Sequence, residues 1–298
     1  NSLMEILCMG KEAIYRRLRG EVAFTFEEVS LISQHLGISL DKIVGRRMLN
    51  DTMFDLNLLH TGDPIESYYE ILVRYAKLFD LLRDDPTASV ATASNLIPFT
   101  FYSPYECLSK FRLGRWIYHH GKMKPPASLS DLQVPDKVPQ MHWKLSASIR
   151  QLSHTSFIWD YNIFRSIVKE IRYFAGLDLL SAEDVRNMKK ELGLLLSELE
   201  AVTTTGEFSK GHSLAIYLSD INFEATYTYV EKGDFQACLF RVYSINSMDS
   251  QNPRMCNIQK NWIQSLKRHS TLISQSSEIQ RRQFFNEQRE IVESLQEA

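Results

Sequence analysis

The sequence has few features of a membrane protein or of a metal-binding protein. The four cysteines, Cys8, Cys107, Cys238 and Cys256, are scattered along the chain, and no spacing among them fits a zinc site. No signal peptide is evident, and no apolar run approaches the roughly 20 residues that a membrane span needs. We therefore expect reduced thiols in a cytoplasmic protein.

Catalytic signatures are missing as well. The sequence contains no glycine-rich phosphate loop, no nucleophile elbow and no HExxH motif. The adjacent His119 and His120 have no acidic or cysteine partner at a metal-binding spacing, which is typical of a solvated helix end. We predict no catalytic residue, no metal ligand and no cofactor, and we do not expect an enzyme.

An overall excess of positive charge is also absent, which excludes a generally basic nucleic-acid-binding protein. The 298 residues carry a formal net charge of −2, and their 44% apolar and 23% charged content is that of a globular protein. Residues 1–46 hold six cationic side chains and six carboxylates. Four of these cations, however, lie within Lys11–Arg19. Any affinity for DNA must therefore come from where the cations lie.

The stretch that organises this segment is Leu3–Gly20, LMEILCMGKEAIYRRLRG. Its apolar anchors are Leu3, Leu7, Ile14 and Leu18. They form two pairs four residues apart, so each pair lies on one helix face. Cys8-Met9-Gly10 separates the pairs and suits a tight turn. The pattern predicts two short helices that pack along one apolar seam.

The outer face of the second helix carries the side chains that could contact DNA. Long cationic side chains on such a face can reach phosphates and guanine edges. The predicted DNA-binding residues are Gly10, Lys11, Glu12, Tyr15, Arg16 and Arg19. A simpler interpretation of Glu12 and Arg16 is a surface pair at i and i+4.

At these residues the chain resembles the lambda-repressor/Cro-like (XRE) helix-turn-helix domain. The similarity continues through Thr25–Gly37, where Thr25 and Glu28 have the spacing of a capping box. It extends through Ile38–Gly45, with Ser39 as N-cap. The resemblance covers about the first 46 residues and implies a DNA-binding domain whose second helix enters the major groove.

The segment departs from the family in two respects. The family's first helix would precede Asn1, so the sequence predicts a domain whose first helix is missing from the chain. Cys8 stands where the family usually has glycine, and Gly10 where serine or threonine is common. The second departure changes the N-terminal contact of the recognition helix.

Beyond this domain the periodicity predicts a mainly α fold. Residues 47–62 form a connector with a short strand near Phe54, and residues 63–205 form a larger helical domain. Residues 206–298 form a small α+β region, because the period changes at Gly206. We expect a small antiparallel sheet there, from strands at His212–Ser219, Asn222–Glu231 and Phe235–Tyr243.

Within the helical domain we expect irregular stretches at Pro86–Pro104 and Gly121–Pro139. Further helices are expected at Tyr105–His120, Met141–Ser153, Ile158–Gly176 and Ser181–Thr203. The order of a helix-turn-helix, a helical middle and a small sheet resembles a type of regulator seen in Bacteroidetes. That broader resemblance implies no particular ligand.

Together these features predict a transcriptional regulator that binds specific sequences of double-stranded DNA. One near-neutral helix-turn-helix offers few phosphate contacts, so we expect a homodimer. The apolar helix Pro64–Arg83 and the terminal helix Phe284–Leu295 are the candidate interfaces, and a small-molecule effector is a further candidate partner. The alternative is a protein–protein interaction module that retains the helix-turn-helix fold.

Overall fold

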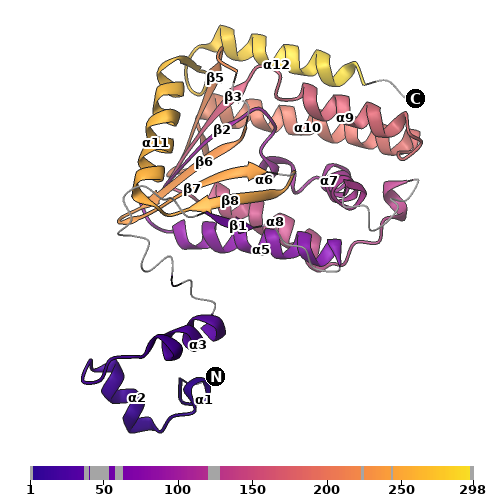
Figure 1. Ribbon diagram of the computed structural model, residues 1–298. Coiled ribbons are helices and arrows are strands. Elements are labelled where there is room, and N and C mark those ends of the chain that lie inside the picture. The colour runs from indigo at the N-terminus through magenta and orange to yellow at the C-terminus, as the bar shows by residue number, and fades with distance from the viewer. Residues whose placement is uncertain are drawn as a thin grey trace. The chain divides into compact units, whose positions relative to one another are not determined.

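The computed structural model describes residues 3–36, 40, 54–57, 63–119, 128–222, 225–242 and 244–295 (Figure 1). The chain divides into two compact units, Asn1–Met53 and Phe54–Ala298. Apart from Leu40, the helix expected at Ile38–Gly45 lies outside the described residues, as does most of the connector.

The first unit contains three described helices, α1 (Leu3–Leu7), α2 (Lys11–Leu18) and α3 (Phe26–Leu36). They enclose a small core of Ile6, Leu7 and Ile14, against which Leu3, Met9, Phe24 and Ile32 pack. The capping box at the start of α3 is confirmed. The Glu28 amide donates to Thr25 Oγ1 at 3.3 Å, and the Thr25 amide donates to Glu28 Oε2 at 2.9 Å.

Leu18 was wrongly predicted to belong to the buried seam, since 59% of its surface is exposed. Arg17 lies on the inner side of α2 instead, three residues after the buried Ile14. Its guanidinium binds the Glu28 carboxylate through Nε at 3.0 Å and Nη2 at 2.8 Å. Because Leu18 is the last residue of α2, no following turn covers it.

The second unit is organised around one nine-stranded mixed sheet. Along the sheet the order is β1-β8-β7-β6-β2-β3-β5-β4, and β9 also pairs with β5. The neighbours β2, β3 and β5 are parallel, and the remaining pairs are antiparallel. The strands are β1 (Asp55–Asn57), β2 (Ser89–Ser94), β3 (His154–Asp160), β4 (Glu207–Ser209), β5 (His212–Ser219), β6 (Tyr227–Lys232), β7 (Phe235–Val242), β8 (Asn246–Ser250) and β9 (Ser270–Leu272).

Helices cover both faces of this sheet unequally, as Figure 1 shows. Helix α11 packs on one face against β2, β5, β6 and β7, whereas the other helices contribute to the main core on the opposite face. The helices are α5 (Pro64–Leu82), α6 (Phe99–Tyr102), α7 (Glu106–His119), α8 (Lys137–Arg150), α9 (Arg165–Ala175), α10 (Ala182–Thr205), α11 (Pro253–Arg268) and α12 (Glu278–Glu293), with a 3-10 turn at Leu129–Asp131.

Strand β3 shows how the sheet separates two cores. Phe157 and Trp159 point into the main core, whereas Ile158 points toward α11 and packs in a smaller cluster with Cys238 and Cys256. This alternation follows from the two-residue period of a strand. Both faces of the central strands are therefore buried, as expected for parallel strands covered by helices on each side.

The predicted fold class was wrong. The protein is a mixed α/β structure whose sheet spans most of the chain; it is not a mainly α protein with a small C-terminal antiparallel sheet. Two central strands were missed. β2 lies in the stretch expected to be irregular, and β3 occupies the start of the helix expected at Ile158–Gly176. β2, SVATAS, is built mostly from small residues, and β3 contains the continuous apolar run Phe157–Trp159, so neither shows a clear alternation of apolar and polar residues.

Several local predictions are confirmed. β5 occupies His212–Ser219 as expected, and β6 and β7 form the predicted hairpin, with Gly233 at φ 52°. Ser181 caps α10 in a capping box with Asp184.

The apolar stripes of the two candidate interface helices, α5 and α12, pack into the chain's own main core. Among the described residues, no helix is long and apolar enough to cross a membrane.

Candidate functional site

All six predicted DNA-binding residues are exposed, four of them on α2 and two at its ends. Gly10 is the N-cap of the helix, in an extended conformation, and Arg19 is its C-cap. Lys11, Glu12, Tyr15 and Arg16 are likewise exposed, while Ile14 is buried with only 4% of its surface accessible. The Lys11 Nζ lies 5.7 Å from the centre of the Tyr15 ring. This surface offers cations and an aromatic ring on one face.

Carboxylates neutralise part of that surface. Arg19 Nε lies 2.7 Å from Glu21 Oε1, and its Nη2 lies 3.3 Å from Glu12 Oε1. Arg16 Nε lies 3.5 Å from Glu21 Oε2. Arg16 therefore pairs with Glu21, and the alternative pair of Glu12 with Arg16 does not form. The sequence analysis did not predict these ion pairs of Glu21. Glu21 lies beyond the end of α2, and the turn that follows the helix places its carboxylate beside both arginines.

The turn before α2 has a left-handed residue. Cys8 adopts φ 50°, a conformation that glycine tolerates more readily than any other residue. This backbone conformation explains why a glycine would suit the position. The Cys8 side chain is exposed and forms no disulfide.

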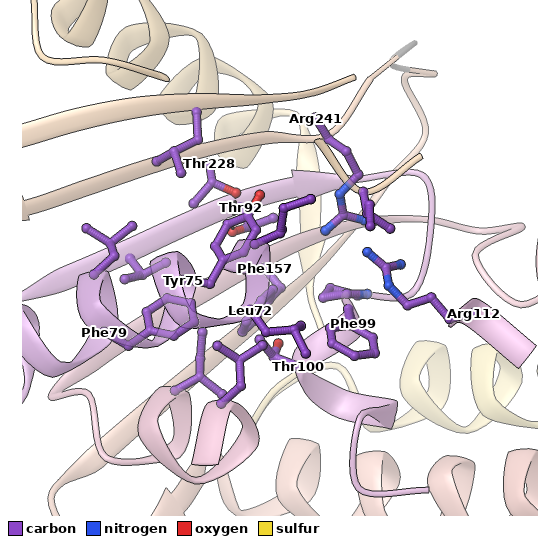
Figure 2. Close-up of a pocket in the computed structure, with 18 of the residues that line it drawn as sticks. Leu72, Tyr75, Phe79, Thr92, Phe99, Thr100, Arg112, Phe157, Thr228 and Arg241 are labelled. Atoms are coloured by element: carbon purple, nitrogen blue, oxygen red, sulfur yellow. Dashed lines mark hydrogen bonds between the residues drawn. The ribbon is translucent and has the colours of Figure 1, made fainter. Parts of the chain in front are cut away.

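A second candidate site is a cavity of about 70 Å³ in the second unit (Figure 2). It lies between α5, α6 and the sheet, and most of its wall is apolar, including Leu72, Phe79 and Phe157. A neighbouring, more polar cavity of about 150 Å³ shares Arg112 and Arg241 with it. The polar cavity also includes Leu96 and Ile97, which follow β2, and Ile163, which follows β3.

Arg112 on α7 and Arg241 on β7 meet between the two cavities. Figure 2 shows their guanidinium groups pointing toward one another. Arg112 is 7% exposed, donates from Nη1 to the Tyr102 hydroxyl at 3.1 Å and lies 4.3 Å from the centre of the Phe99 ring. Its Nε is buried without a hydrogen-bond partner. Among the described residues, no carboxylate pairs with Arg112 or Arg241.

A third arginine, Arg115, lies one helical turn after Arg112 and pairs with Glu170 of α9. Burial lowers the pKa of Arg115 and of Arg241, and for Arg241 the nearby Arg112 acts in the same direction. Burial alone would raise the pKa of the Tyr102 hydroxyl. Arg112, Arg115 and Arg241 together outweigh it and leave the pKa of Tyr102 below its ordinary value. The site therefore has a positive field.

Sequence reasoning did not identify this arginine cluster, although a weak signal existed. Arg112 and Arg115 are three residues apart on a helix with apolar residues on several sides, where charged groups are rarely buried. Arg241 continues the inward-facing positions of Ala237 and Leu239 on β7. Only the fold brings Arg241 to the cavity that Arg112 and Arg115 line.

Of the histidine pair, His119 is the exposed last residue of α7, as expected for a solvated helix end, and His120 lies outside the described residues. His142 is buried, and its Nε2 lies 3.1 Å from the Tyr68 hydroxyl. Within the described part of the chain, no group of histidine, cysteine and acidic residues could hold a metal ion.

Comparisons with known proteins found no match: no protein-family model, no curated protein and no solved structure is significantly similar to this chain.

Proposed function

We propose that this protein is a cytoplasmic transcriptional regulator that binds specific sequences of duplex DNA through α2. The observation that carries the proposal is that Gly10, Lys11, Glu12, Tyr15, Arg16 and Arg19 are all exposed, on or at the ends of a helix anchored by Ile14. A short helix fixed by a small core and preceded by a tight turn can present its outer face to the major groove. The resemblance to the XRE family supports the same role.

The proposal includes a homodimer. α2 offers few cations, and Glu12 and Glu21 offset part of their charge, so one copy gives few phosphate contacts. Two copies related by a dyad would double those contacts and read two half-sites about one helical turn apart. Sedimentation of the full chain at micromolar concentration, with and without DNA, tests this. A monomer under both conditions contradicts it.

Selection of bound sequences from a random duplex pool by the full-length protein tests the main proposal. We expect a recurring, dyad-related motif whose binding weakens steeply with added salt. Recovery of random sequences alone, or binding that does not change with salt, contradicts sequence-specific binding by α2.

A second candidate function is a protein–protein interaction module. One observation favours it: Arg16 and Arg19 are both paired with carboxylates, which gives α2 a nearly neutral face. A module of this kind would not shift duplex DNA at low salt. Measuring the binding of duplex DNA from low to high salt therefore distinguishes the two candidate functions.

A further inference from the structure

We propose that the second unit binds a small amphipathic oxyanion, with its charged head between Arg112 and Arg241 and its apolar part in the cavity beside them. The proposal concerns binding by the second unit and does not depend on DNA recognition by the first. It rests on the placement of the arginines, the two adjoining cavities and their position in the fold.

The site holds more cationic than anionic side chains. Three guanidinium groups, from Arg112, Arg115 and Arg241, surround the polar cavity, and Glu170 is the carboxylate that lines it among the described residues. A buried arginine stays protonated, and a buried charge without a partner is costly. A bound oxyanion would supply the missing negative charge and accept hydrogen bonds from the guanidinium groups.

Polar contacts within the chain leave guanidinium donors of this site unused. Arg112 uses Nη1 for Tyr102 and stacks on Phe99, but its Nε has no partner. The guanidinium of Arg241 has no described hydrogen-bond or ion-pair partner. Guanidinium groups present several donors in a plane, which match the oxygens of a carboxylate or phosphate. The head group is therefore an oxyanion.

The space beside the arginines suits an apolar group. The cavity of about 70 Å³ has an apolar wall formed by α5, α6 and the sheet, with two threonine hydroxyls, Thr92 and Thr228, on the sheet side. These hydroxyls lie 3.1 Å from each other and can satisfy one another. The volume exceeds what one water molecule needs, and its apolar wall favours an apolar group.

The position in the fold agrees with a ligand site. Leu96 and Ile97 follow the carboxyl end of β2, and Ile163 follows the carboxyl end of the parallel neighbour β3. In open α/β sheets, ligands bind beyond the carboxyl ends of parallel strands. The arginines lie where that edge meets β7.

The test compares an anion with a neutral ligand of the same shape. The full-length protein is titrated with octanoate and with octanamide by calorimetry and thermal shift, below any micelle concentration. We expect saturable binding and a raised melting temperature with octanoate, and at least tenfold weaker binding of octanamide. Octyl phosphate and inorganic phosphate then distinguish a carboxylate head from a phosphate head. Equal binding of octanoate and octanamide, or no binding of any anion, overturns the proposal.

Variants assign the binding to the arginines. Arg241→Gln should weaken octanoate binding at least tenfold, whereas Arg282→Gln, at an exposed arginine paired with Glu278, should leave it unchanged. Without ligand, Arg241→Gln should melt at the parent temperature or above it, because it removes a half-buried charge that has no carboxylate partner among the described residues. A lower melting temperature with unaltered octanoate binding would mean a structural role and refute the assignment. The comparison of octanoate with octanamide on the parent protein stands even if this variant does not fold.

Discussion

The Glu21 carboxylate holds Arg19 in an ion pair of 2.7 Å at the end of α2, and the same carboxylate lies 3.5 Å from Arg16. One acidic side chain therefore restrains two of the six residues proposed to contact DNA. Each pair would have to loosen or rearrange when those arginines meet phosphates.

Replacing Glu21 should consequently strengthen DNA binding. In Glu21→Gln, Arg16 and Arg19 lose their shared carboxylate, so we expect tighter binding to all duplexes and a steeper dependence on salt. Glu27→Gln on α3 makes the same change of net charge at an exposed position and should have a smaller effect. Fluorescence anisotropy at several salt concentrations measures both variants. Equal effects would show that only net charge matters.

Arg16 and Lys11 should have different roles in DNA binding: Arg16 should recognise bases and Lys11 should contact the phosphate backbone. Arg16→Ala should lose about 1–3 kcal/mol of discrimination between specific and random duplexes, if Arg16 makes a bidentate contact with guanine. Lys11→Ala should weaken binding to all duplexes alike and make the affinity less dependent on salt. Competition binding with specific and random DNA measures both. Parental behaviour in both variants would contradict the assignment of α2 as the recognition helix.

The turn at Cys8 gives a stability prediction for the first unit. Because Cys8 adopts φ 50°, Cys8→Gly should leave the free energy of unfolding unchanged or raise it by up to about 1 kcal/mol. Cys8→Val should lower it by about 1–2 kcal/mol, since a β-branched residue is disfavoured there.

The tryptophans allow this effect to be assigned to one unit. All four, Trp116, Trp143, Trp159 and Trp262, belong to the second unit. Urea unfolding of the Cys8 variants should therefore shift the circular dichroism transition without shifting tryptophan fluorescence. A change confined to fluorescence would contradict the prediction.

The buried His142 should make the second unit less stable in acid. Burial, with a smaller contribution from Arg112, lowers the pKa of His142 to about 4, against an unfolded value of about 6.5. Between these values the unfolded chain binds more protons than the folded one. The stabilisation is therefore complete above about pH 6.5 and declines as the pH falls toward 4, by about 3 kcal/mol over the whole interval.

Urea unfolding followed by tryptophan fluorescence at several pH values measures this loss. His142→Gln should show a shallower decline below pH 6.5 than the parent, because glutamine does not titrate. His154→Gln, at an exposed histidine on β3, should keep the parental slope. If the parent and His142→Gln decline in parallel, His142 does not control the acid response.

The sequence alone determined the features that depend on neighbouring residues. Ser181 and Asp184 form a capping box within one helical turn, and the β6–β7 hairpin turns at Gly233. The exposed face of α2 follows from helical periodicity around Ile14. In each case the physical cause lies within a few residues, so the local pattern was sufficient.

The tertiary structure decided what depends on distant partners. β2 and β3 carry small residues or a continuous apolar run, and their identity as strands comes from pairing with one another and with β5 and β6. The arginine cluster joins Arg112 and Arg115 to Arg241, more than a hundred residues later in the chain. No helical or strand periodicity predicts this cluster, because it forms only when the folded sheet places the end of β7 beside the same cavity as α7.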